Sequence, residues 1–193
     1  MRSLKFLLAA AVAFGFAGTA LADADISRPP VAFGKAITDA ELAAWNIDVS
    51  TTDGAGLPPG KGSVAEGKKI FAEKCVACHG EAAKGGPQYG SMVGGIGSFK
   101  TNKRALTPGS MYPYAPILFD YTRRAMPMDS PQSLTDNEVY ALSAYILSLN
   151  GLVKENATLD AKSLAAISMP NKDGFIRDDR PDTHAVRCMK NCN

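Results

Sequence analysis

Two cysteines and a histidine in one short segment, Cys75-Val76-Ala77-Cys78-His79, are the residues best suited to chemistry. Thiols three positions apart on a helical turn lie on one face, so both can reach one edge of a flat cofactor. The C-x-x-C-H spacing is typical of covalent haem attachment, in which the two thiols form thioethers with the haem. His79 would then bind the iron as its proximal ligand.

Two other interpretations of these cysteines are a zinc site and a redox-active thiol pair. A zinc site needs a second pair of ligands at matching spacing, and none follows in the sequence. A thioredoxin-like pair needs a surrounding β-α-β pattern, which is also missing. We therefore predict one haem c, covalently attached through Cys75 and Cys78.

A methionine is the expected sixth iron ligand of an electron carrier. Met126 is the first candidate, because it ends a predicted helix and precedes Pro127, which stiffens the following loop. Met128 is its main rival, and either methionine could instead be core filler. His184 would give two histidine ligands, but it lies in a polar tail. We expect His79 to donate its second ring N–H to a backbone carbonyl, for which Pro87 is the candidate.

Capping boxes and apolar periodicity predict the elements that position these residues. A box beginning at Ser63 predicts a helix that starts near Val64 and delivers both thiols. A box beginning at Thr135 predicts the last long helix, and Gly67 would let the two helices cross closely. Because no convincing strand alternation is present, the fold class is mainly α. Shorter helices are predicted over 116–125, after Thr38, and from Asp160 to Ile167.

The N-terminus has the pattern of a secretory signal peptide. Arg2 and Lys5 precede an apolar run over 6–16, and the small-residue motif at 20–22 predicts cleavage after Ala22. The alternative is a retained anchor. We expect export to the periplasm and no membrane span in the mature chain. That chain carries 19 basic and 19 acidic residues, which argues against nucleic acid as a partner.

Two further cysteines, Cys188 and Cys192, lie at the C-terminal end. Free thiols rarely persist in an oxidising compartment, and residues four apart in a helical turn are within bridging range. We predict a disulfide between them. The alternative is a metal site that these two cysteines would share with His184.

The chain resembles a class I cytochrome c over about residues 63–151. The matching parts are Gly67-x-x-x-Phe71, the CVACH segment, Gly86-Pro87, Met126-Pro127 and Tyr145-Ile146. The resemblance implies a class I cytochrome c fold at 63–151, flanked by an N-terminal extension at 23–62 and a C-terminal extension at 152–193.

A narrower resemblance, over roughly 36–192, is to the cytochromes of bacterial sulfur oxidation. It rests on LAAWNIDVSTTDGAGLPPGKGSVAEG, MYPYAPILFDYTRRAMPMDSPQSLTDNEVYALSAYILSLNG and SMPNKDGF. The haem subunit of sulfur dehydrogenase has two haem motifs and this chain has one, so it is more similar to the single-haem partners of sulfite dehydrogenases. The resemblance implies a periplasmic sulfite dehydrogenase, a molybdenum enzyme, as electron donor. A downstream cytochrome or terminal oxidase would be the acceptor.

The same resemblance suggests that Tyr112, Tyr114 and Arg123 or Arg124 lie near the haem propionates. The competing interpretation of the arginines is a solvated helix face. Trp45 is predicted to anchor the N-terminal segment on the domain.

We thus expect a periplasmic electron carrier that is not itself an enzyme. Three alternatives stay open: a tightly bound haem subunit of a dehydrogenase complex, a haem sensor, and an enzyme acting directly on sulfur compounds.

Overall fold

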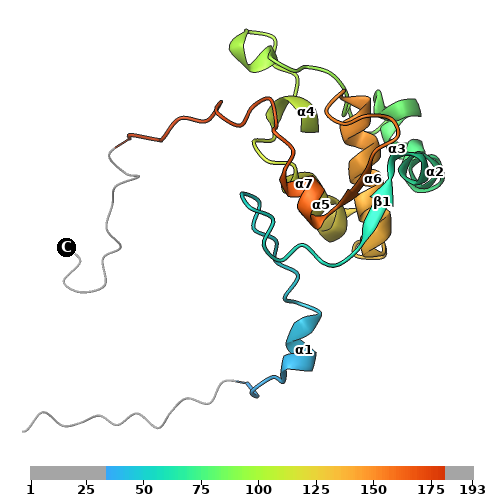
Figure 1. Cartoon of the computed structure of the whole chain (residues 1–193), viewed down its shortest axis with the longest axis vertical. Helices are drawn as coiled ribbons and strands as arrows, with labels where there is room; N and C mark the ends of the chain where they lie inside the picture. The colour runs from blue at the N-terminus through green and yellow to red at the C-terminus, as the bar shows by residue number, and fades with distance from the viewer. Residues whose placement is uncertain (1–33, 181–193) are drawn as a thin grey trace, which may run out of the picture.

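The computed structural model describes residues 34–180, and it is predominantly helical in that range (Figure 1). The predicted mainly α class is confirmed. The elements are α1 Asp39–Ala43, β1 Lys61–Ser63, α2 Val64–Lys74, α3 Val76–His79, η1 Glu81–Ala83, η2 Ser98–Lys100, α4 Pro108–Met111, α5 Pro116–Ala125, α6 Asp136–Leu149, β2 Thr158–Asp160 and α7 Ala161–Ala165.

The centre of the fold is the crossing of α2 and α6. Both predicted capping boxes are formed, so each helix begins one residue after its N-cap, Ser63 or Thr135. A Cβ atom added at Gly67 would lie 1.9 Å from the Ala141 carbonyl oxygen. Only glycine therefore permits this close approach, as the sequence predicted. The ring of Phe71, 2% exposed, packs on Tyr145 in the core below the crossing, with ring centroids 5.5 Å apart.

A short antiparallel sheet, which the sequence analysis missed, ties the C-terminal segment to the start of the domain. Strand β1 pairs with β2 so that Gly62 lies opposite Leu159. Three-residue strands are too short to show a period-two pattern. The segment then continues into the core, where Leu164 and Met169 are buried. The first part of the predicted C-terminal extension is therefore packed on the domain.

The N-terminal segment is held differently. Helix α1 has its predicted capping box, yet it has no buried residue and stands apart from the body (Figure 1). Trp45 is 81% exposed. The prediction that Trp45 anchors this segment on the domain is wrong. A tryptophan signals an anchor only where a partner surface faces it, and here none does among the described residues.

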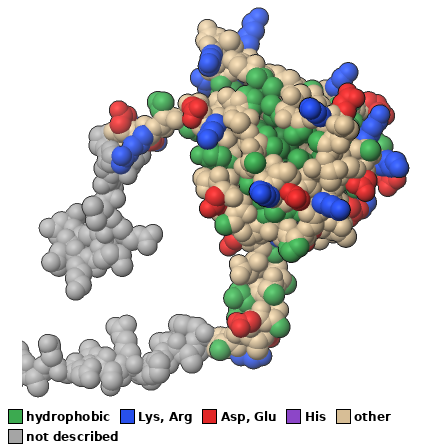
Figure 2. All heavy atoms as spheres, viewed as in Figure 1, with side chains coloured by type: hydrophobic (Ala, Val, Ile, Leu, Met, Phe, Trp, Pro, Cys, Tyr) green, Lys and Arg blue, Asp and Glu red, His purple; other side chains and the backbone are tan. Residues whose placement is uncertain are grey.

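Charged side chains of both signs are interspersed on the face that Figure 2 shows, around apolar side chains near its centre. Between residues 34 and 180, no helix is both long and apolar enough to cross a membrane. Several predictions concern residues outside the described range. These are the signal peptide with its cleavage after Ala22, the Cys188–Cys192 disulfide and the alternatives that involve His184.

Candidate functional site

A cavity of about 810 Å³ lies between the end of α2, α3, α4, α5 and α6. Its volume is in the range of pockets that bind a cofactor-sized ligand. Much of the lining is apolar, including Phe71, Leu118, Leu134, Leu142 and Ile146. Such a lining favours a ligand with a large apolar surface, because binding removes that surface from water.

Cys75, Cys78 and His79 all line one wall of this cavity. The prediction that a single helix delivers both thiols needs correction, because α2 ends at Lys74. Cys75 has φ −126° and ψ −29°, outside the helical range, and α3 begins after it as a separate turn. Cys75 and Cys78 are both half-buried, and neither forms a disulfide with a described residue.

The His79 ring lines the cavity and has one buried nitrogen, Nδ1, which makes no hydrogen bond with any described residue. Burial lowers the pKa of the imidazole, which favours the neutral form that binds metals. Pro87 does not line the cavity and accepts no hydrogen bond from this ring among the described residues. The orienting role of the Pro87 carbonyl stays a prediction.

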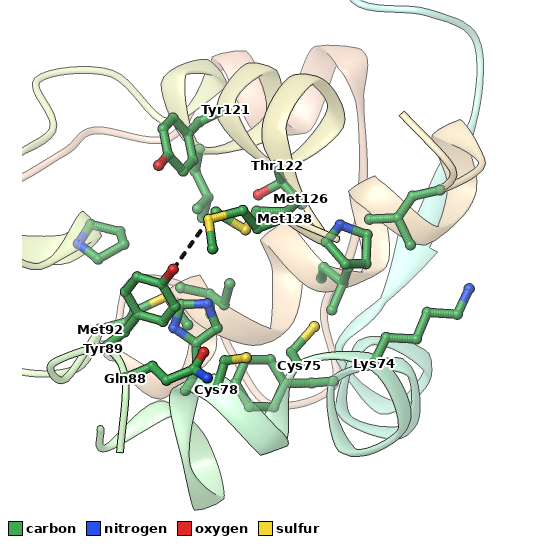
Figure 3. Close-up of a pocket in the computed structure, with 18 of the residues that line it drawn as sticks. Lys74, Cys75, Cys78, Gln88, Tyr89, Met92, Tyr121, Thr122, Met126 and Met128 are labelled. Atoms are coloured by element: carbon green, nitrogen blue, oxygen red, sulfur yellow. Dashed lines mark hydrogen bonds between the residues drawn. The ribbon is translucent and has the colours of Figure 1, made fainter. Parts of the chain in front are cut away.

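The methionines lie across the cavity from the cysteines (Figure 3). Met126 is the C-cap of α5 and is half-buried, whereas Met128 is 62% exposed. Both line the cavity. A ligand that must exclude water from the iron is better placed when buried, so the geometry favours Met126 over Met128.

Of the four candidates for propionate contacts, one lines the cavity and three do not. Tyr112 lines the cavity, and burial raises the pKa of its phenol. Tyr114, Arg123 and Arg124 are not among the lining residues. Arg123 Nε lies 3.0 Å from Asp136 Oδ1, and the Arg124 guanidinium lies 2.7 Å from Asp120 and 3.5 Å from Asp48. Both arginines are thus engaged in ion pairs away from the cavity, closer to the competing interpretation than to a propionate role.

Two site residues were missed by the sequence reasoning. Tyr89 stacks on the His79 ring, with centroids 5.2 Å apart and planes inclined by 27°. Asn150 accepts a hydrogen bond from Gly94 N at 3.0 Å and donates one to the Met92 carbonyl at 3.0 Å, which fixes the loop on one side of the cavity. An aromatic residue just after Gly86-Pro87 was the available signal for Tyr89.

The residues fit a covalently bound haem better than a metal ion alone. Among the described residues, no group of three or more His, Cys, Asp or Glu side chains could hold a metal ion. The cavity instead offers two thiols on one edge, an imidazole with an unpaired buried nitrogen, and thioethers opposite. These are the groups that haem attachment and its axial ligation require.

Comparison with known proteins decides the family. The cytochrome c family model matches residues 64–150. A chain in the crystal structure of the sulfane dehydrogenase SoxCD from Paracoccus pantotrophus is 36% identical, with a TM-score of 0.73, and the match covers 84% of this chain and 82% of that one. The chain is a class I c-type cytochrome. Family membership implies a covalently attached haem c, and Cys75 and Cys78 are placed as its attachment residues.

Shorter parts of this cytochrome resemble subunits of cbb3-type cytochrome c oxidases. FixP of Bradyrhizobium sp. (strain ORS 278) is 58% identical over 38 residues, which are 19% of this chain and 13% of FixP. CcoP of Rhodobacter capsulatus is 28% identical over 99 residues, which are 50% of this chain and 33% of CcoP. The cytochrome therefore matches a third or less of the length of these relatives.

Proposed function

We propose that this cytochrome carries single electrons in the periplasm, with His79 and Met126 as the axial ligands of its haem. The haem supplies one-electron chemistry, since its iron alternates between ferric and ferrous states. The observation that carries the proposal is one cavity lined by Cys75, Cys78, His79 and Met126, with the thiols and Met126 on opposite sides. Beyond the two cysteines that would bind the haem covalently, the residues of the cavity would hold and shield the group.

Each wall has a distinct task in this proposal. Neutral His79 would bind the iron, and half-buried Met126 would serve as the second protein ligand and shield the iron from water. Tyr112 would donate a hydrogen bond to a propionate, because a half-buried phenol with a raised pKa remains protonated and needs an acceptor. A sixth site filled by methionine leaves no open position for substrate, which favours a carrier over a sensor or an enzyme.

We further propose a sulfur-compound dehydrogenase as the electron donor, with a periplasmic sulfite dehydrogenase, a molybdenum enzyme, as the first candidate. A downstream cytochrome or terminal oxidase would accept the electrons. The SoxCD match supports a role in sulfur oxidation because it covers far more of the chain than the cytochrome c family model alone. The single C-x-x-C-H segment supports a single-haem carrier.

Stopped-flow reduction tests the donor. Ferric cytochrome is mixed with sulfite, with and without purified sulfite dehydrogenase, while the haem absorbance is followed. We expect fast reduction only when the enzyme is present, and slower reduction of an unrelated c-type cytochrome used as control. Failure of the enzyme to reduce the cytochrome would contradict the sulfite dehydrogenase assignment.

A second candidate function is that of a tightly bound haem subunit of a dehydrogenase complex, and the likeness to a chain of SoxCD favours it. The two candidates differ in kinetics. Reduction of a carrier should speed up in proportion to its own concentration, whereas reduction inside a stable complex should not. Gel filtration of the mixture provides a second criterion, because only a subunit would elute together with the dehydrogenase.

A further inference from the structure

Tyr89 contacts both walls of the cavity, and its two contacts use different parts of the side chain. Its ring stacks on the His79 imidazole. Its hydroxyl donates a hydrogen bond to Met128 Sδ, 3.1 Å away (Figure 3). One half-buried side chain thus joins the segment of the proximal ligand to the loop of the distal one.

The loop that carries Tyr89 is firmly fixed. The Gly86 amide donates to the Tyr89 carbonyl at 2.9 Å, and the Gly85 amide donates to the His79 carbonyl at 3.0 Å. The Met92 amide donates to the Ala83 carbonyl at 2.8 Å. These backbone bonds restrain the loop on the His79 side of the cavity, from which the Tyr89 hydroxyl reaches Met128.

The loop that carries Met126 and Met128 is held more lightly. After the last helical bond, from the Met126 amide to the Thr122 carbonyl, the Ser130 amide donates to the Pro127 carbonyl at 2.9 Å. Among the described residues, the Tyr89–Met128 bond is the one side-chain hydrogen bond between this loop and the Tyr89 loop. Met128 is two residues from Met126, so a restraint on one limits the movement of the other.

We propose that Tyr89 is a positioning residue that keeps Met126 on the iron by restraining Met128 from the proximal side. The proposal rests on the axial ligands proposed above. A thioether is a weak acceptor, so the bond is a modest restraint rather than a lock. The loop must give up this bond before Met126 can move away and an external ligand can enter. The exposed Met128 then has a function distinct from ligation.

Competition by imidazole for the Met126 position of the ferric holoprotein tests this directly. Imidazole binding is read from loss of the charge-transfer band of methionine-ligated ferric haem. Tyr89→Phe keeps the ring and removes the donor, and Met128→Leu keeps the bulk and removes the acceptor. We expect each variant to bind imidazole about 3- to 10-fold more tightly, and a tenfold change corresponds to about 1.4 kcal/mol.

The double variant and a matched control separate positioning from a general loosening of the protein. Because both changes break one bond, Tyr89→Phe/Met128→Leu should bind imidazole no more tightly than the better of the two single variants. Tyr145→Phe removes a phenol hydroxyl that does not line the cavity and that makes no hydrogen bond with residues 34–180, and it should leave the affinity unchanged.

Unchanged imidazole affinity in both single variants, or fully additive effects in the double variant, would overturn the proposal. A wild-type protein without the methionine band would overturn it as well, together with the Met126 assignment. Failure of the sulfite dehydrogenase experiment alone would leave these imidazole results standing, so the two proposals fail separately.

Discussion

Helices α1 and α2 both begin with a capping box, but α2 is packed in the core and α1 is exposed. Each has a capping box, in which the N-cap hydroxyl of Thr38 or Ser63 accepts the backbone N–H of a glutamate three residues on. Helix α2 then buries Gly67 and Phe71 against α6, whereas α1 buries nothing. The difference teaches that a cap determines where a helix begins, and that apolar burial determines whether the helix belongs to the core.

The largest loss of stability should come from a larger side chain at the α2–α6 crossing. Gly67→Val places side-chain atoms where even a Cβ would lie 1.9 Å from the Ala141 carbonyl oxygen. We expect a loss of at least about 3 kcal/mol of unfolding free energy, or no folded holoprotein at all. Gly90→Ala is the control, because a Cβ there has no neighbour within 4 Å. Equal stability of the two variants, measured by urea unfolding, would refute the close crossing.

Removing the main apolar contact of α2 should lower the unfolding free energy by a comparable amount, with the helix crossing itself left intact. Phe71 is 2% exposed and packs against Tyr145, so Phe71→Ala leaves a cavity in the core. We expect about 3 to 5 kcal/mol of destabilisation and weaker retention of the native haem spectrum on heating. Ile37→Ala, on the exposed N-terminal side of α1, serves as the apolar control and should leave Tm unchanged.

The capping boxes themselves allow the most direct comparison of the two environments. Thr135→Ala at the start of α6 should lower the unfolding free energy by about 1 kcal/mol, because the end of a core helix loses its cap. Thr38→Ala removes the same kind of cap from α1 and should not change Tm, because α1 is not packed on the body. A similar loss in both variants would show that α1 folds together with the core.

The ion pair between Lys74 of α2 and Glu138 of α6 should make the stability of the protein depend on pH. The Lys74 ammonium, 2.6 Å from Glu138, and the Thr135 backbone amide lower the pKa of the Glu138 carboxyl. Because the folded pKa lies below the unfolded one, this stabilisation is present above about pH 4.5 and is lost as pH falls through the folded pKa. Lys74→Met should therefore lower stability at pH 6 more than at pH 3. The difference should be below about 1 kcal/mol, since the pair is partly exposed.

The smallest effect is expected in the N-terminal segment. Trp45 is 81% exposed, so Trp45→Ala should change the unfolding free energy by less than about 0.5 kcal/mol. Thermal unfolding of the isolated holoprotein is the measurement. A drop in Tm comparable with that of Thr135→Ala would mean that Trp45 packs on the domain in solution.

Features written in adjacent residues could be predicted from the sequence. The capping boxes at Thr38, Ser63 and Thr135 form as expected, and α5 has the predicted bounds. The CVACH segment predicted the haem family for the same reason, since its chemistry is contained in five consecutive residues.

Features that depend on pairs of residues far apart in the sequence could not be predicted. Arg124 was considered for a propionate, but Asp48, 76 positions earlier, forms an ion pair with it. The pairing of β1 with β2 joins segments almost a hundred residues apart through three-residue strands. The Tyr89–Met128 bond spans 39 positions, and neither residue carries a local signal of it. Each of these contacts joins segments that are far apart in the sequence, and local patterns do not encode such pairs.

The assignment of the iron ligands is most directly tested by the charge-transfer band of methionine-ligated ferric haem in three holoproteins. These are the wild type, Met126→Ala and Met128→Ala. We expect the band in the wild type and in Met128→Ala, and its loss in Met126→Ala. Retention of the band in Met126→Ala, or its loss only in Met128→Ala, would contradict the site described here.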